Sequence, residues 1–283
     1  MRRLGVHTSI AGGLHLSLER AHALGCDTLQ IFSHNPRGWA VKAISEEEAG
    51  RFKTLRAAFD ISPVYIHASY LINMASKDAL LRKKSVDLLS VELYRADAIG
   101  ADYVILHAGS ASGDDGHIAR QRAVDALKAV ARGKKWKAGL LIENTAGERG
   151  DISSGMRELA EIVHGVAGPL IAGVCIDTCH AFAAGYDIGT GKGVIRIADE
   201  LEKYIGIDNV KLIHLNDSKG AAGSGLDRHE HIGCGKIGVK GLKQFINNPA
   251  FKAVPLVLET PKKEETDDPA NIDRVRKMMN AQW

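Results

Sequence analysis

The sequence predicts an α/β protein, a single-domain (β/α)₈ barrel spanning residues 1–283, and three observations support this fold class. Short apolar segments recur eight times, amphipathic stretches lie between them, and an acidic or histidine side chain closes seven of the eight segments. Eight strand–helix units in 283 residues match the usual size of such a barrel. No low-complexity linker divides the chain. A doubly wound open sheet is the alternative.

The expected strands are short, rich in Ile, Val and Leu, and bounded by Gly, Pro, Ser or Asn, as buried parallel strands are. In chain order they are Leu4–His7, Thr28–Phe32, Val64–His67, Tyr103–His107, Gly139–Glu143, Ile171–Asp177, Val210–His214 and Pro255–Glu259.

Helical periodicity predicts helices between these strands. The clearest are Asp78–Gly100, His117–Gly133, Glu158–Val166, Val194–Gly206 and Asn271–Trp283. Ser45 followed by Glu48 is typical of a capping box that opens a further helix. The apolar positions of the first helix, which include Leu80, Val91 and Tyr94, fit one helical face imperfectly.

Composition narrows the class of protein. The chain is 45% hydrophobic and 25% charged, which excludes a disordered, collagen-like or coiled-coil chain. No apolar stretch approaches the ~20 residues that a membrane-spanning helix needs. Four cysteines without paired spacing indicate reduced thiols and a cytoplasmic location. The net charge of +3 is compatible with a polyanionic partner.

Polar side chains stand at the carboxyl ends of the expected strands. They are His7, His67, His107, Glu143, Asp177, His214 and Glu259, and only the second strand, which ends at Phe32, lacks one. In a barrel these ends converge on one mouth, whereas in an open sheet they would spread along an edge. The pattern therefore favours the barrel and predicts a polar site at its mouth.

The carboxylates of this set follow apolar residues with no cation beside them, and a metal ion neutralises buried carboxylates most completely. Asp177 and His180 are three residues apart, and Asp227 and His229 are two apart, so the two side chains of each pair can close on one ion or on adjacent ions. Nitrogen and oxygen donors without thiolate suit Zn²⁺ or Mn²⁺. Nine donors exceed one tetrahedral site, so three ions are expected; the nine are His67, His107, Glu143, Asp177, His180, His214, Asp227, His229 and Glu259. A buried ion-pair network without metal is the alternative.

Four other sequence features are interpreted as structural and not functional. Gly233–Gly238 matches G-x-G-x-x-G but follows a loop, so we expect a tight βα loop and not a dinucleotide site. Cys175 and Cys179 are interpreted as small buried apolar residues. His231 is interpreted as a solvated loop histidine, and the charged run 262–268 as a solvated loop.

Several motifs together resemble the endonuclease IV family, the zinc-dependent apurinic/apyrimidinic endonucleases of base-excision repair. They occur in the family's order at His67–Asn73, Leu106–Ser110, Ile142–Gly147, Gly173–Asp187, His214–Lys219, Gly223–His229 and Leu258–Thr260. The resemblance implies a TIM barrel with a trinuclear zinc site at its mouth. It puts one zinc on His67, His107 and Glu143, a second on Glu143, Asp177, His214 and Glu259, and a third on His180, Asp227 and His229.

The same resemblance implies a deoxyribonuclease that acts on double-stranded DNA containing abasic sites. It would hydrolyse the phosphodiester bond 5′ to the lesion and leave a 3′-hydroxyl and a 5′-deoxyribose phosphate, with Glu143 and Glu259 catalytic and no protein nucleophile. The family's DNA contacts fall on Arg37, Tyr70 and Leu71, with Lys219, Arg228 and Lys236 at phosphates. A monomer is expected.

Four positions depart from the family pattern, and they are Gly38, Ala108, Gly225 and Cys234. None is an expected ligand, but Gly225 removes one expected phosphate contact. Two other functions remain open on the residues alone: a metal-dependent sugar isomerase or epimerase on the same fold, and a zinc-containing protein that binds lesions without cutting. The isomerase would not need His180, Asp227 and His229, and structural zinc sites are usually rich in thiolate.

Overall fold

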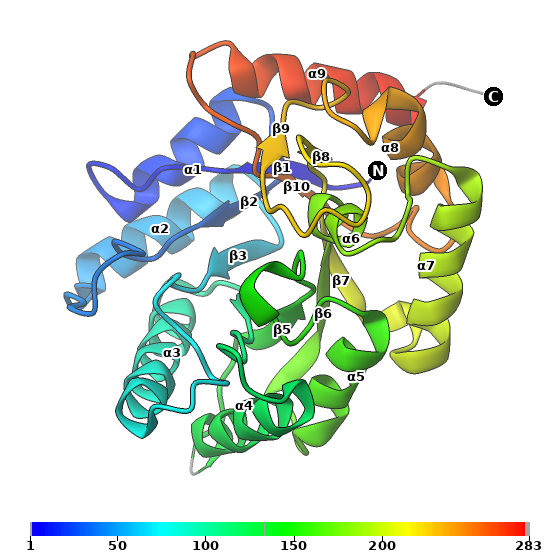
Figure 1. Cartoon of the computed structure of the whole chain (residues 1–283). Coiled ribbons are helices and arrows are strands. Elements are labelled where there is room, and N and C mark those ends of the chain that lie inside the picture. The colour runs from blue at the N-terminus through cyan, green and yellow to red at the C-terminus, as the bar shows by residue number, and fades with distance from the viewer. Residues whose placement is uncertain (1, 133, 281–283) are drawn as a thin grey trace.

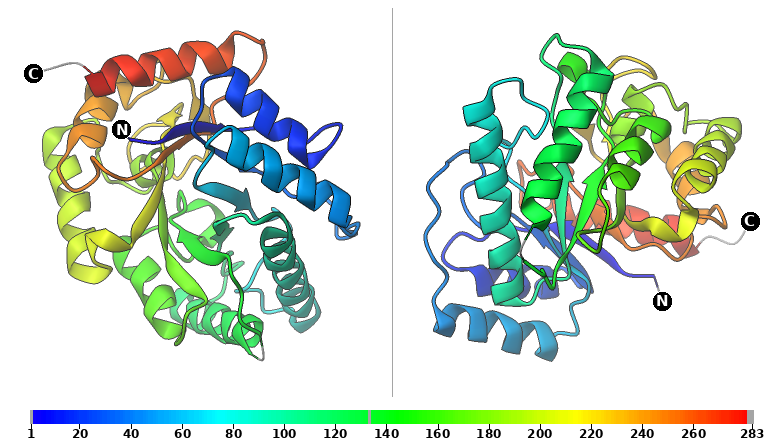
Figure 2. Two further views of the ribbon diagram at one scale, coloured as in Figure 1. Left: turned by 180° about the vertical axis from the view of Figure 1, so that it is seen from behind. Right: turned by 90° about the horizontal axis from the view of Figure 1, so that it is seen from below.

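In the computed structural model, which describes residues 2–132 and 134–280, eight parallel strands form a closed barrel surrounded by helices (Figure 1). Around the barrel the strands follow the order β1-β10-β7-β6-β5-β4-β3-β2, so the first strand pairs with the second on one side and with the last on the other. The view from behind and the view from below both show the helices outside the strands (Figure 2). The predicted barrel is confirmed, and the open sheet is excluded.

The strands lie where the apolar segments predict them. They are β1 Leu4–His7, β2 Thr28–Ile31, β3 Val64–His67, β4 Tyr103–His107, β5 Gly139–Glu143, β6 Ile171–Asp177, β7 Val210–His214 and β10 Leu256–Leu258. Only β2 and β10 are shorter than expected, because Phe32, Pro255 and Glu259 lie outside the paired residues. Glu259 is therefore the first residue after its strand.

The helices that follow the strands are α1 Leu14–Ala23, α2 Glu46–Ala58, α3 Ala79–Ile99, α4 Gly116–Ala131, α5 Met156–Gly165, α6 Thr178–Ala183, α7 Gly191–Tyr204, α8 Gly238–Asn247 and α9 Asp267–Asn280. Two predicted helix ends, Gly133 and residues 281–283, lie outside the described residues. For α1, α6 and α8 the sequence predicts no helix bounds. No helix in the described ranges combines the length and the apolar character needed to cross a membrane.

The predicted capping box before α2 is half formed. Ser45 Oγ accepts a hydrogen bond from Glu48 N at 3.1 Å, as expected for an N-cap residue. The Glu48 side chain does not return to Ser45; its Oε1 accepts a hydrogen bond from Leu14 N at 3.2 Å and so links α2 to the start of α1.

Two apolar layers support the strands. Inside the barrel, Tyr65, Ile105, Leu141, Cys175, Leu212 and Val257 form a closed core. A much larger layer fills the space between strands and helices. The barrel interior is therefore a packed core and not a channel.

The inner face of α3 differs from the predicted one. Leu80 and Tyr94, assigned to the apolar face, are 73% and 59% exposed. Glu92 and Arg95 are buried in their place, at 1% and 7% exposure. The imperfect periodicity of this stretch has a physical cause, because two charged residues occupy positions that face the protein interior.

A small addition covers the mouth beside α6. Strands β8 Asp217–Ser218 and β9 His229–Glu230 form a two-stranded antiparallel sheet. The Asp217 carboxylate accepts hydrogen bonds from the backbone N–H groups of Gly235, Ile237 and Gly238. The glycine-rich stretch is therefore a loop held by Asp217 before α8, as expected, and it follows no barrel strand.

Candidate metal centre

The barrel mouth brings together the nine side chains that sequence analysis expects to bind metal. Five come from the ends of successive strands, and they are His67, His107, Glu143, Asp177 and His214. Glu259 follows β10, His180 lies on α6, His229 begins β9, and Asp227 precedes it. Residues separated by up to 192 positions in sequence therefore meet in one place because the strands are parallel and the barrel is closed.

His67, His107 and Glu143 form a first group of donors, and Glu143, Asp177, His214 and Glu259 form a second, so the two groups share Glu143. His107 Nε2 and His67 Nε2 lie 3.0 and 3.4 Å from Glu143 Oε2. His214 Nδ1 lies 2.8 Å from Glu143 Oε1 and 3.4 Å from Glu259 Oε2. The two oxygens of one carboxylate thus face two different sets of donors.

A third group lies on the α6 side of the mouth. Asp227 Oδ1 lies 3.2 Å from His180 Nε2 and 3.5 Å from His229 Nε2. His229 Nε2 is also 3.6 Å from Asp177 Oδ2, which joins this group to the second. Within each of the three groups the donor atoms lie within 4.8 Å of one another.

The charges and unpaired atoms of this cluster fit a cation. Within residues 2–132 and 134–280, every ion pair made by Glu143, Asp177, Asp227 and Glu259 has a histidine as its partner. Three buried atoms of the cluster, His107 Nε2, Glu143 Oε2 and His229 Nε2, have no hydrogen-bond partner. Buried polar atoms are normally satisfied, so their convergence, with nitrogen and oxygen donors only, fits zinc or manganese.

Hydrogen bonds orient the histidine rings. The Nδ1 atoms of His67, His180 and His229 lie 2.8, 3.0 and 3.1 Å from the backbone carbonyl oxygens of Ala68, Asn144 and Glu259 respectively. A carbonyl oxygen only accepts, so Nδ1 carries a proton, and Nε2 is the nitrogen that faces the cluster. This pairing is typical of metal-binding histidines, whose second nitrogen donates to an oxygen.

The cluster also shifts the pKa values of its members. Burial would raise the pKa of Glu143, but the adjacent His214 and His107 rings outweigh it and hold that pKa well below its ordinary value. Burial would lower the pKa of His180, but the charges of Asp177 and Asp227 and the hydrogen bonds with Asp227 and Glu143 raise it well above its ordinary value. The carboxylates thus stay charged and attract positive charge.

Gln30, on β2, is a site residue that was not predicted from the sequence. Its amide is fully buried; Oε1 accepts from His214 Nε2 at 2.6 Å, and Nε2 donates to Glu259 Oε1 at 2.5 Å. β2, the strand whose carboxyl end has no acidic or histidine residue, therefore supports His214 and Glu259 of the second group through the neutral side chain of Gln30. A Gln inside an otherwise apolar strand segment, Thr28–Phe32, was the available signal.

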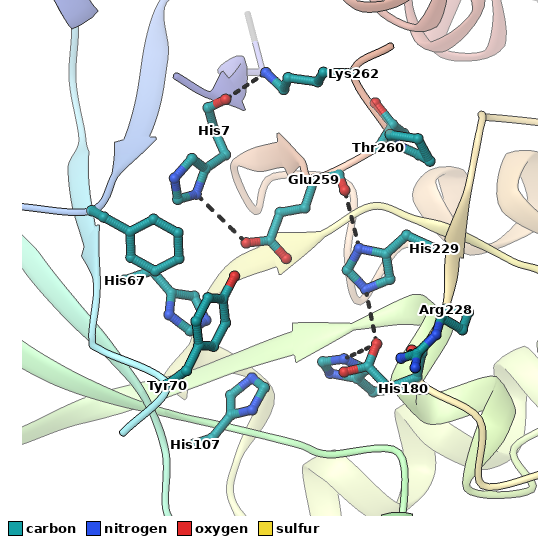
Figure 3. A pocket seen from close by; sticks show the side chains of 13 residues that line it. His7, His67, Tyr70, His107, His180, Arg228, His229, Glu259, Thr260 and Lys262 are labelled. Carbon is teal, nitrogen blue, oxygen red and sulfur yellow. Dashed lines mark hydrogen bonds and ion pairs between the residues drawn. The ribbon is translucent and has the colours of Figure 1, made fainter. Parts of the chain in front are cut away.

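A cavity of about 460 Å³ opens above the cluster. Figure 3 shows His107, His180, His229 and Glu259 around this space, with Tyr70 at its edge. Its lining residues are His7, Phe32, His67, Tyr70, His107, His180, Asp227, Arg228, His229, Glu259, Thr260, Pro261 and Lys262.

Two further lining residues, His7 and Lys262, are not among the nine expected donors. His7, the first strand-end histidine, lies 2.9 Å from Gln30 Nε2 through Nδ1 and belongs to none of the three groups. Lys262 opens the run expected to be a solvated loop, but its Nζ donates to His7 O and, at 2.6 Å, to Asp268 Oδ2.

The residues expected to contact DNA lie around the mouth and are more dispersed than the nine donors of the metal centre. Tyr70, 62% exposed, and Arg228 line the cavity. Arg37, Lys219 and Lys236 are exposed and lie outside its lining. Leu71, half-buried beside Tyr70, is also outside it.

Two cysteines are close enough to the site to be donors: Cys175 Sγ lies within 4.8 Å of ligand atoms of Glu143 and His214, and Cys179 Sγ lies within 4.8 Å of ligand atoms of Asp177 and His229. Cys175 and Cys179 are fully buried, and burial raises the pKa of each thiol to about 12, so both stay protonated. His231 is half-buried and its Nδ1 lies 3.1 Å from Asn271 Nδ2 on α9, so the interpretation as a solvated histidine is wrong.

Comparison with known proteins agrees with this architecture. Residues 18–282 match the family model described as xylose isomerase-like TIM barrel. The probable endonuclease 4 of Methanoculleus marisnigri is 43% identical over 279 residues, which cover 98% of this chain and 99% of that protein. The crystal structure of endonuclease IV from Thermus thermophilus superposes with a TM-score of 0.86 at 38% identity, covering 98% of each chain.

A D-tagatose 3-epimerase-like protein superposes with a TM-score of 0.74 at 18% identity over 98% of this chain and 97% of that one, a likeness that extends to the fold alone. Identity near 40% over nearly the whole length distinguishes the two endonucleases from this epimerase-like protein. The chain therefore belongs to the endonuclease IV family, and it is an endonuclease built on a xylose isomerase-like TIM barrel.

Proposed function

We propose that this protein hydrolyses the phosphodiester bond on the 5′ side of an abasic site in duplex DNA, acting as a monomer and leaving a 3′-hydroxyl and a 5′-deoxyribose phosphate. The main support is the convergence of nine nitrogen- and oxygen-bearing side chains, in three groups, beneath an open cavity. The names of the relatives support an endonuclease in preference to an isomerase.

Three zinc ions would occupy the three groups, with manganese as the alternative at one or more of them. One would be held by His67, His107 and Glu143, a second by Glu143, Asp177, His214 and Glu259, and a third by His180, Asp227 and His229. Zinc in such sites supplies Lewis acidity towards phosphate oxygens and acidifies water, so no protein nucleophile is needed.

Two carboxylates of the metal-binding groups, Glu143 and Glu259, would have the catalytic roles. Glu143 spans the first two groups with its two oxygens and keeps them at a fixed separation. Glu259 lines the cavity, where its carboxylate is held by Gln30 and can orient a water toward the phosphorus. The histidines, fixed through their outer nitrogens, keep the donor atoms in place.

Damage recognition would depend on the mouth loops. An abasic nucleotide has no base to unstack, so turning it out of the helix costs less than the few kcal/mol that a normal nucleotide requires. Arg37, Tyr70 and Leu71 would fill the vacated space in the duplex. Lys219, Arg228 and Lys236 would contact phosphates without reading sequence.

Metal analysis of the purified protein, combined with cleavage of a duplex carrying one abasic site, tests this proposal. We expect about three zinc ions per chain, by the number of groups, and a single cut 5′ to the lesion whose 3′ end a DNA polymerase extends. Chelation should abolish cutting, and added zinc should restore it. Tight binding without cutting in zinc-replete buffer would instead indicate a lesion-binding protein, and ketose isomerisation without cutting would indicate an isomerase.

A further inference from the structure

Glu92 is a buried carboxylate in the middle of α3 that the proposed chemistry does not use. Its side chain is 1% exposed. A charge removed from water in this way is stable only with hydrogen-bonding partners that replace its hydration. Glu92 finds these partners on two loops that are far from it in sequence.

Three donors surround the Glu92 carboxylate. Ser33 Oγ donates to Oε2 at 2.7 Å. His34 Nε2 lies 2.7 Å from Oε1, and Ser69 N donates to the same oxygen at 3.2 Å. Ser33 and His34 begin the loop between β2 and α2, and Ser69 lies in the loop between β3 and α3, so one carboxylate holds both loops.

Arg95, almost one turn further along α3, completes the arrangement. Its Nε donates to Ser33 Oγ at 2.9 Å, and its Nη atoms donate to the carbonyl oxygens of Ser33 and Lys42. Ser33 Oγ therefore accepts from Arg95 and donates to Glu92. The first loop is fixed at its start and again near its end.

The two loops also contact each other directly. Ser69 Oγ donates to Pro36 O at 2.7 Å and accepts from Leu71 N at 3.2 Å. Pro36 immediately precedes Arg37, and Ser69 immediately precedes Tyr70. The backbones that carry the proposed DNA contacts are thus joined by one hydroxyl, which Glu92 holds through the backbone of the same serine.

We propose that Glu92, together with Arg95, is a positioning residue that joins the 33–45 loop and the 68–78 loop into one rigid recognition element. Arg37, Tyr70 and Leu71 then enter the duplex as a unit, and DNA binding loses less loop entropy because the loops are ordered beforehand. The consequence for DNA rests on the proposed function of those three residues, whereas the joining of the loops does not.

Glu92→Gln tests the proposal while keeping the size of the side chain. The amide nitrogen cannot accept from Ser33, His34 or Ser69, so the buried network loses acceptors. We expect hydrogen exchange to accelerate about tenfold or more in peptides from both loops, with the barrel strands unchanged. Preference for abasic over undamaged duplex in binding should fall about tenfold, while turnover at saturating DNA changes far less.

Ser69→Ala is the second variant, because it removes only the link between the loops and should accelerate exchange around residues 36 and 71. Glu19→Gln, an exposed carboxylate on α1, controls for the chemical change. Ile99→Ala, in the buried end of α3, controls for lost stability and should leave exchange in both loops and lesion preference unchanged at a matched interval below its melting temperature.

Unchanged loop exchange in both Glu92→Gln and Ser69→Ala would overturn the joining of the loops, whatever the DNA results. Faster exchange with unchanged lesion preference would overturn the role in damage recognition. Failure of the wild-type protein to cut abasic DNA contradicts the proposed function and leaves the exchange measurement decisive for Glu92.

Discussion

The metal centre and the surrounding DNA-binding rim are built in different ways, although they share one barrel mouth. Most side chains of the centre stand at the ends of barrel strands, and Glu143, Asp177 and His214 have no solvent exposure. Those of the rim lie on loops, and Tyr70 is 62% exposed. Strand pairing fixes the first set directly, whereas the second depends on buried polar contacts such as those of Glu92.

This difference predicts how each region responds to substitution. In the centre most donors are shared between groups or held by a second hydrogen bond, so removing one of them should affect catalysis strongly. On the rim each side chain supplies one of several contacts with the DNA, so single changes should affect binding modestly. Variants in the two regions should therefore separate turnover from lesion preference.

The largest effect is expected for Glu259→Gln. The variant should fold and bind abasic duplex, but single-turnover cleavage should fall by about 10²–10³-fold, the usual loss when one preorganised electrostatic group is removed. Glu265→Gln, an exposed carboxylate in the same segment, is the matched control. Full cleavage by Glu259→Gln would remove this residue from the mechanism.

A smaller effect is expected for Gln30→Leu, which keeps the volume but removes the contacts with His214 and Glu259. Loss of such outer hydrogen bonds typically lowers metal affinity about 10–100-fold. Competition with a zinc chelator, followed by metal analysis, measures it without reference to activity. Gln121→Leu, on the exposed side of α4, should retain wild-type affinity; equal affinity in Gln30→Leu would show that Gln30 does not support the centre.

The same two regions show what the sequence could predict. The nine donors were identifiable because charged or imidazole groups at the ends of apolar strands are unusual, and a closed barrel leaves them one place to meet. Gln30 escaped notice because a neutral amide in a strand carries no such contrast. Whether the nine donors bind metal stays a prediction.

The rim was less accessible to prediction because loop conformation depends on tertiary hydrogen bonds and not on periodicity. Glu92 and Arg95 are not among the residues expected on the inner face of α3, although each is buried. The sequence indicated their burial only indirectly, because the apolar residues of α3 do not by themselves form one complete helical face. Glu48, predicted to close a capping box, instead contacts Leu14, another tertiary contact that local sequence does not specify.

On the rim, Arg37→Ala should reduce preference for abasic over undamaged duplex about tenfold, a loss of about 1.4 kcal/mol, with a smaller change in turnover. Arg37 is exposed, and its backbone N donates to Asn35 Oδ1 at 3.1 Å, so the loop should keep its shape without the guanidinium. Competition binding with both duplexes measures the ratio. Arg157→Ala, 77% exposed on α5, is the control. An unchanged ratio would argue against insertion at the lesion.

The smallest effects are expected for Lys219→Ala and Lys236→Ala. Lys219 lies 4.0 Å from Glu230 and Lys236 is exposed, so neither ammonium group is committed to a buried partner. Each contact with a phosphate releases counterions, so each variant should reduce the slope of log Kd against log salt by about 0.9 and weaken abasic and undamaged duplex equally. Lys277→Ala, on α9 and paired with Asp273, should leave the slope unchanged. A change in lesion preference without a change in slope would mean that these lysines act through the lesion and not through the DNA backbone.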